Sequence, residues 1–165
     1  MKLLILAGPN GAGKTTIAES LLKEIGIEEF VNVDQIAKGL SMLHPERSAF
    51  KAARIALARI DQLLDEQCDF AVETTLSSNN ILKLIRKAKE IGYYVICHFY
   101  SLPNVNASIK RVQHRVTLGG HNIPVETIKR RYKRGIHNFF INVVDAVDSW
   151  FFYSNLDDLR LIAYQ

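Results

Sequence analysis

Cysteine, proline and tryptophan are scarce in this chain, whose 165 residues include two, four and one of them respectively. Cys68 and Cys97 lie in apolar surroundings and show no Cys-x-x-Cys or Cys/His metal spacing, so we expect buried, reduced thiols. No segment is rich in proline, serine or glutamine, and no internal repeat is apparent. These absences argue against a disulfide scaffold, a cysteine metal centre and a disordered linker.

A long hydrophobic run is also missing. The N-terminal apolar stretch, residues 3–7, is too short to cross a bilayer and passes directly into a glycine-rich segment, which leaves no room for a signal peptide. We therefore expect no membrane association and a cytoplasmic location. The length suits one compact domain over residues 1–165, and 48% hydrophobic with 23% charged residues is ordinary for a globular protein.

The formal net charge of +4 is unevenly distributed. Residues 110–134 hold eight basic side chains and Glu126 as the one acidic residue, a local charge of +7, so the rest of the chain carries −3. One basic segment on a mildly acidic body suits a single concentrated anion, such as a triphosphate. This distribution disfavours nucleic acid as a partner.

Apolar runs with the strand pattern alternate with segments of helical periodicity. Strands are expected at residues 3–7, 30–33, 70–72, 93–100, 150–153 and 159–163. Helices are expected at 17–25, 50–64, 81–88 and 105–116, and from Pro124, at a first helical position, to residue 143, with Gly135 as a bend. The alternation predicts an α/β fold: a P-loop NTPase three-layer sandwich with a mainly parallel sheet of about five or six strands.

The segment Gly8-Pro-Asn-Gly-Ala-Gly-Lys-Thr15 matches G-x-x-x-x-G-K-[ST] and lies between the first expected strand and helix, as that motif requires. Backbone N–H groups of such a loop surround phosphate, its lysine reaches the β and γ phosphates, and its threonine hydroxyl binds Mg²⁺. The expected nucleotide ligands are Gly8, Pro9, Asn10, Gly11, Ala12, Gly13, Lys14, Thr15 and Thr16, with Thr15 also binding metal. The glycine spacing does not fit the dinucleotide motif G-x-G-x-x-G.

Two acidic residues follow expected strands. Asp34 ends the second strand, where it could accept the proton of an attacking hydroxyl; alternatively, it caps the following helix. Glu73 follows the third strand and could orient Mg²⁺ through water or, with Thr74, bind the acceptor; alternatively, it is a solvated strand end, with Thr74 and Thr75 capping the next turn. Asp34, Glu73 and Thr74 are thus candidate substrate ligands.

Four arginines are candidates for phosphate binding. Arg111 and Arg115 lie one turn apart on a helical face, where an anion would relieve their repulsion. Arg130 and Arg131 lie beyond a glycine-containing connection, residues 117–123, which suits a lid over about residues 111–134. We expect Arg111 and Arg115 to bind nucleotide, Arg115 and Arg131 to stabilise the transferring phosphoryl group, and Arg130 to bind substrate. For each, a solvated surface charge is the alternative, as it is for His121 in the lid.

The order and spacing of these motifs resemble the zeta-toxin family of P-loop kinases, particularly its shorter bacterial members. The likeness rests on the P-loop, Asn32-Val-Asp34, His44-Pro45, Glu73-Thr-Thr-Leu76, Arg115-Val-x-x-Gly-Gly-His121-x-Ile-Pro124 and Arg130-Arg-Tyr132. It implies a catalytic base at Asp34, lid arginines at Arg115 and at Arg130 or Arg131, ATP as donor, a UDP-linked amino sugar as acceptor and a small antitoxin as partner. Ala37 or Lys38 stands where the family often has arginine, so the donor side is matched better than the acceptor side.

The sequence therefore favours an ATP- and Mg²⁺-dependent kinase that uses Lys14, Asp34, Arg115 and Arg131 to phosphorylate a hydroxyl of a small molecule. Two alternatives remain open. One is a kinase for nucleic-acid 5′ hydroxyls, in which the basic segment binds a strand backbone. The other is an ATP-dependent switch or partner-binding ATPase without a second substrate.

Overall fold

Strands and helices alternate along the chain. The strands are β1 (Lys2–Ala7), β2 (Glu29–Val31), β3 (Phe70–Thr74), β4 (Tyr94–Ser101), β5 (Ser149–Asn155) and β6 (Leu159–Tyr164). The helices are α1 (Lys14–Ile25), α2 (Val33–Leu40), α3 (Ala49–Asp65), α4 (Asn80–Ile91), α5 (Val105–Thr117) and α6 (Val125–Asn138), with a 3-10 turn η1 (Pro45–Ser48) and a π-helical turn η2 (Phe139–Val143). The computed structural model describes residues 1–42, 44–120, 122–156 and 158–165.

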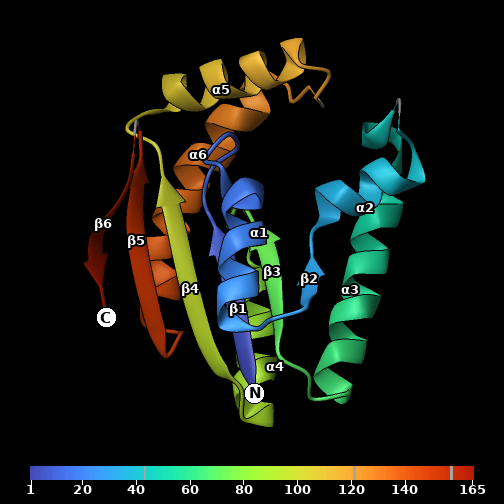
Figure 1. Ribbon diagram of the computed structural model, residues 1–165, viewed down its shortest axis with the longest axis vertical. Coiled ribbons are helices and arrows are strands. Elements are labelled where there is room, and N and C mark those ends of the chain that lie inside the picture. The colour runs from blue at the N-terminus through green and yellow to red at the C-terminus, as the bar shows by residue number, and fades with distance from the viewer. Residues whose placement is uncertain (43, 121, 157) are drawn as a thin grey trace.

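The described strands form one six-stranded sheet in the order β2-β3-β1-β4-β5-β6. The first five of these strands are parallel, and β6 pairs antiparallel with β5. Because β1 lies between β3 and β4, the loop that follows it opens near the middle of the sheet's carboxyl edge (Figure 1). Ligands of open α/β sheets bind at this edge.

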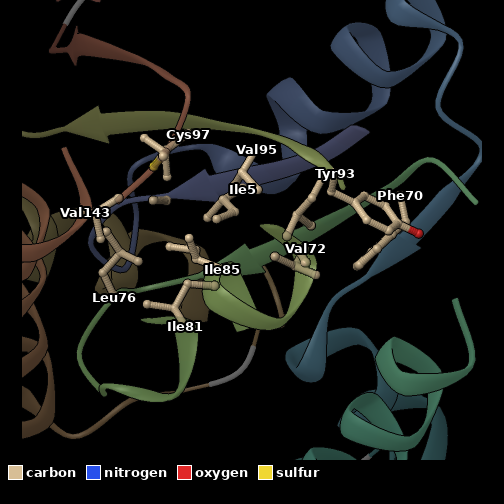
Figure 2. Packing of buried hydrophobic residues seen from close by; sticks show 14 of the residues in the cluster. Ile5, Phe70, Val72, Leu76, Ile81, Ile85, Tyr93, Val95, Cys97 and Val143 are labelled. Atoms are coloured by element: carbon tan, nitrogen blue, oxygen red, sulfur yellow. The ribbon is translucent and has the colours of Figure 1, made fainter. Parts of the chain in front are cut away.

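Helices cover both faces of the sheet, because side chains of a buried parallel strand alternate between two apolar faces. On one face, Leu3 and Ile5 pack with residues of α3, α4 and η2; Figure 2 shows the Ile81 and Ile85 side chains of α4 turned toward Ile5 and Val72. On the other face, Leu4 and Leu6 pack against α1. The predicted α/β sandwich with a mainly parallel sheet is confirmed.

Several predicted boundaries were wrong near the carboxyl edge. The second strand ends at Val31 rather than residue 33, because the Asn32 side chain caps α2 by accepting a hydrogen bond from the Gln35 backbone N–H. Asp34 therefore lies in the first turn of α2, neither at a strand end nor at the cap position. Glu73 and Thr74 are the last residues of β3 rather than residues that follow it.

The C-terminal helix also differs from its prediction. Pro124 precedes α6 instead of opening it, and the residues after Asn138 form the π-helical turn η2. Gly135 lies inside α6, where a Cβ atom would collide with the Thr75 backbone carbonyl. The missing side chain thus lets α6 pack directly on the loop after β3. Within the described ranges, no helix is both long and apolar enough to cross a membrane.

Candidate active site

The glycine-rich loop connects β1 to α1 and packs against β4. Gly8 has a φ of +142°, and a side chain there would collide with the Tyr100 backbone carbonyl. This close approach requires glycine. Gly13, in the left-handed conformation, leads directly into α1. The loop therefore directs backbone N–H groups and the positive end of the α1 dipole at one place, an arrangement that binds anions.

Lys14 is buried beneath this loop, with 5% of its surface exposed. Its Nζ donates to the carbonyl oxygens of Gly8 and Pro9 at 3.0 and 3.1 Å and lies 3.6 Å from Glu73 Oε1. Burial lowers the pKa of the Lys14 ammonium below its usual range, and the carboxylates of Glu73 and Asp34 partly oppose this change. A bound phosphate would supply Lys14 with a stronger partner than the two carbonyls.

Glu73 connects the loop to α2. Its Oε2 accepts hydrogen bonds from the Thr15 hydroxyl and from the Asn32 side-chain amide, both at 2.7 Å. A hydroxyl and a carboxylate beside a phosphate site are the few protein oxygens that Mg²⁺ uses when phosphates and water complete its octahedral shell. Thr15 and Glu73 thus fit a magnesium ion bound together with a nucleotide.

A cleft of about 920 Å³ opens over this cluster. One wall comes from α5, α6 and their connection and the other from α2, η1 and the start of α3; the two stand on opposite sides of the glycine-rich loop (Figure 1). We call the second wall, which contains Asp34, Gln35, Ala37, Lys38, Met42, Pro45 and Glu46, the α2–η1 wall. Both walls line the same cleft.

Most predicted site residues line this cleft. They are Asn10, Gly11, Gly13, Lys14, Thr15, Thr16, Asp34, Glu73, Arg111, Arg115 and Arg131. Gly8, Pro9 and Ala12 belong to the same loop but are not part of the lining. Arg130 is exposed outside the lining, and the Thr74 hydroxyl accepts a hydrogen bond from the Leu76 backbone N–H instead of facing the cleft. His121 lies outside the described residues.

Neighbouring elements hold the loop in place. The Arg111 guanidinium donates to the Gly11 carbonyl at 3.4 Å and also to the Leu156 carbonyl, while the Asn155 amide donates to the Ala12 carbonyl at 2.8 Å. The Ser108 hydroxyl donates to the Asn10 carbonyl. The loop is therefore restrained from α5 and from the end of β5, which preorganises it for phosphate.

A family model described as zeta toxin matches residues 2–149. The chain belongs to the zeta toxin family. Membership supports an ATP-dependent phosphotransferase in general terms, without specifying the acceptor. A Haemophilus influenzae protein described as uncharacterized is 29% identical to this family member over 131 residues, which cover 79% of the present chain and 92% of that protein.

Solved structures share the fold of this zeta toxin family member. One, from the PezAT chromosomal toxin–antitoxin system of Streptococcus pneumoniae, superposes with a TM-score of 0.73 at 17% identity, covering 99% of this chain and 71% of that one. Another, the AvrRxo1-ORF1:-ORF2 complex with ATP, gives 0.68 at 19% identity, covering 99% and 57%. This chain thus spans less than two thirds of the AvrRxo1 complex chain that it matches.

Two asparagines in the site of this zeta toxin family member make contacts that the sequence did not predict. Asn32, a preferred cap residue directly before α2, could have been identified as a cap, but its contact with Glu73 crosses 41 residues of sequence. The Asn155 amide bonds to the Ala12 carbonyl of the glycine-rich loop, a contact that crosses 143 residues of sequence. Of the α2–η1 wall, Pro45 belongs to a motif of the family resemblance and Lys38 to a position where the family often has arginine, but neither signal assigned these residues to the cleft, and Gln35, Met42 and Glu46 lie in no motif.

Proposed function

We propose that this zeta toxin family member uses Mg²⁺ and transfers the γ-phosphate of ATP to a hydroxyl of a small molecule. The observation that carries the proposal is one cleft, lined on its floor by Lys14, Thr15 and Glu73 and on its opposite walls by Asp34 and by Arg115 with Arg131. A donor phosphate on the floor would lie between a carboxylate and cationic side chains. That is the set of groups that phosphoryl transfer uses.

Lys14 and the backbone of the glycine-rich loop bind the β and γ phosphates in this proposal. When a triphosphate arrives, the ammonium exchanges its two carbonyl contacts for charge-assisted bonds to phosphate oxygens. Thr15 and Glu73 are the residues that would hold Mg²⁺, whose charge helps to neutralise the phosphates. Gly8 and Ala12 complete the loop, while Asn10 and Thr16 contact the nucleotide from within the lining.

Asp34 is the proposed base. It is exposed on the first turn of α2 and lines the cleft. A carboxylate at that place can accept the proton of a hydroxyl as the oxygen attacks the γ-phosphorus from the side opposite the leaving ADP. Because the P-loop lies on the floor and Asp34 on the α2–η1 wall, this wall binds the acceptor.

Arg115 and Arg131 are proposed to stabilise the charge of the transferring phosphoryl group. They come from α5 and α6, on either side of the connection that contains Gly119 and Gly120, and both line the cleft. We propose that residues 111–134 act as a lid on a single domain formed by residues 1–165. Arg111 retains the loop near the nucleotide, and Arg130, outside the lining, would need lid movement to reach a substrate.

Similar structures also favour a protein partner for this chain, in addition to a small molecule. The PezAT relative comes from a toxin–antitoxin system, and AvrRxo1-ORF1 was solved in complex with ORF2. We propose that a small antitoxin-like protein binds the present chain as well. A nucleotide sugar is the acceptor class to test first, in keeping with the family resemblance.

The proposal is tested by incubating the protein with γ-labelled ATP, Mg²⁺ and a metabolite mixture containing nucleotide sugars, followed by mass spectrometry. We expect a phosphorylated compound with wild type and with Asp145→Asn, an exposed aspartate outside the cleft lining, but not with Asp34→Asn. Binding of ATP should be retained by Asp34→Asn. Label that appears only as inorganic phosphate would instead favour the ATP-dependent switch, and full turnover by Asp34→Asn would refute the base assignment.

A further inference from the structure

The Asn32 side chain makes two hydrogen bonds, one as an acceptor and one as a donor. Its Oδ1 accepts from the Gln35 backbone N–H at 3.1 Å and so caps α2, while its Nδ2 donates to Glu73 Oε2 at 2.7 Å. Only 5% of its surface is exposed. A single buried amide therefore connects the helix that carries Asp34 to the carboxylate that contacts Thr15 and Lys14.

The chemistry of this contact favours an amide over other cap residues. Serine and aspartate cap helices about as well as asparagine, because capping needs only an acceptor oxygen. Serine is too short to cap and also reach Glu73, and an ionised aspartate would oppose the Glu73 carboxylate with a second negative charge. Asparagine has both an acceptor and a donor in one rigid plane.

The position of Asp34 depends on how the N-terminus of α2 is held. This helix has only eight residues, and a helix of that length gains little stability from its own hydrogen bonds. Of its residues, Ala37 is buried. Asp34 follows Asn32 by two positions, so the contact between Asn32 and Glu73 fixes the first turn of α2 relative to the phosphate-binding floor.

We propose that Asn32 is a positioning residue that sets the distance and direction of Asp34 relative to the γ-phosphate. The inference rests on the proposed function, in which Asp34 is the base and Glu73 belongs to the donor site. Asn32 itself need not touch ATP or the acceptor. Displacing a reacting group by about 1 Å can lower a rate about 100-fold, so loss of this contact should slow transfer while nucleotide binding persists.

The test compares serine substitutions at two helix caps. Asn104 caps α5 in the same way, accepting a hydrogen bond from the Ala107 backbone N–H at 2.9 Å, and its side chain is exposed. Asn32→Ser keeps the cap of α2 and removes the amide that donates to Glu73. Asn104→Ser likewise keeps the cap of α5, but no bond to Glu73 is lost, so it serves as the control. Asn32→Asp, nearly identical in size to asparagine, separates the loss of the donor from the loss of volume.

Each variant is incubated with γ-labelled ATP, Mg²⁺ and a macromolecule-free bacterial extract, and label in organic compounds is measured against label in inorganic phosphate. We expect Asn32→Ser and Asn32→Asp to transfer label to organic compounds at least about tenfold more slowly, with an ATP dissociation constant within about twofold of wild type. Asn104→Ser should match wild type in both quantities. Hydrogen exchange of the Gln35 amide should show that α2 remains capped.

Four outcomes would overturn the inference. Wild-type transfer by both Asn32 variants would show that the contact is dispensable, and loss in Asn32→Ser alone would assign the effect to packing. Slower transfer accompanied by lost protection at Gln35 in both variants would mean that Asn32 merely keeps α2 folded. If wild type transfers no label to any organic compound, the proposed function fails first and this inference with it, a result distinguishable from the other three.

Discussion

The floor and the α2–η1 wall of the cleft are built differently. On the floor and directly beside it, Asn10, Lys14 and Asn32 are each 5% exposed, and the side chains of Lys14 and Asn32 each make two hydrogen bonds. On the wall, Met42 is 88% exposed, and Phe50 nearby on α3 is 80% exposed. The floor is thus fixed before a ligand arrives, whereas the wall offers side chains that a ligand or a protein partner would have to cover.

This difference indicates how the two halves obtain specificity. A phosphate is recognised by backbone N–H groups and one buried cation, whose positions follow from the fold. An acceptor molecule has no such common chemistry, so under the proposed function the α2–η1 wall recognises it through exposed side chains that can change without disturbing the sheet. Substitution of a floor residue that is proposed to bind phosphate, such as Lys14, should therefore weaken ATP binding strongly. Apart from the proposed base Asp34, residues of the wall should have smaller effects, confined to the acceptor.

The largest effect is expected from Lys14→Ala. Removing the ammonium beneath the glycine-rich loop deletes the cation that is proposed to bind the β and γ phosphates. We therefore expect ATP to bind about 100-fold or more weakly, a loss of about 3 kcal/mol. Calorimetric titration with Mg²⁺·ATP measures this loss. Lys38→Ala removes the same group from the α2–η1 wall of the same cleft and should leave the ATP dissociation constant unchanged.

Comparable losses at both lysines would contradict the division between floor and wall. They would indicate that ATP lies across the cleft instead of along the floor. The thermal midpoint of each variant, recorded without nucleotide, separates altered folding from altered binding.

Acid should lower the free energy of unfolding through His98, which lies in the strands beneath the floor of the cleft. This β4 residue packs against Phe151 and Tyr153 of β5. The last residue of β5 is Asn155, whose amide bonds to the glycine-rich loop. The His98 Nδ1 lies 3.3 Å from the Tyr100 hydroxyl. Burial lowers the pKa of His98 to about 4 from an unfolded value near 6.5. The unfolded chain therefore takes up the proton first as pH falls, and stability present above pH 6.5 is lost between pH 6.5 and about 4.

We expect this proton uptake to lower the free energy of unfolding by about 3 kcal/mol over that interval. Urea denaturation at a series of pH values measures the decline, which His98→Phe should reduce. His114→Phe, at an exposed position on α5, is the matched control. An equal decline in wild type and His98→Phe would show that other groups cause the acid sensitivity.

A smaller loss, in the free energy of unfolding, is expected from Gly135→Ala. The added Cβ would collide with the Thr75 carbonyl, so α6 must move away from the loop after β3, at a cost of about 2 kcal/mol. The matched control is Gly39→Ala in α2, where nothing lies within 4 Å and alanine should stabilise the helix by about 0.5–1 kcal/mol. Denaturant unfolding of both variants measures the two values, and equal effects would contradict the close packing of α6.

The contrast between the floor and the α2–η1 wall also determined what the sequence could predict. The glycine-rich loop was located because its residues are contiguous and its chemistry has a fixed spacing, and the strands because buried parallel strands are continuous apolar runs. The second strand was extended too far because Val33 continues the apolar run of β2, and the capping strength of Asn32 was overlooked. That error placed Asp34 on a strand instead of on the first turn of α2.

Contacts between distant segments could not be predicted. Arg111 was expected to bind nucleotide, and the sequence gives no sign that its guanidinium also bonds to the carbonyls of Gly11 and Leu156. Likewise, Arg130 and Arg131 are adjacent in sequence, but only Arg131 is among the residues that line the cleft. Which of two neighbouring helical residues faces a site depends on how α6 packs, and Gly135 determines that packing through a loop far away in the sequence.

The smallest effect is expected on the α2–η1 wall. Lys38 is exposed and lines the cleft, so a contact between its ammonium and an anionic acceptor is largely screened by water. We expect Lys38→Ala to raise the KM for the acceptor about three- to fivefold, or less than about 1 kcal/mol, with kcat preserved. Steady-state kinetics with the acceptor identified by mass spectrometry measure this, with Lys51→Ala on α3, outside the lining, as the control. A fall in kcat at constant KM would instead place Lys38 beside the transferring phosphate and move the boundary between the two halves of the cleft toward α2.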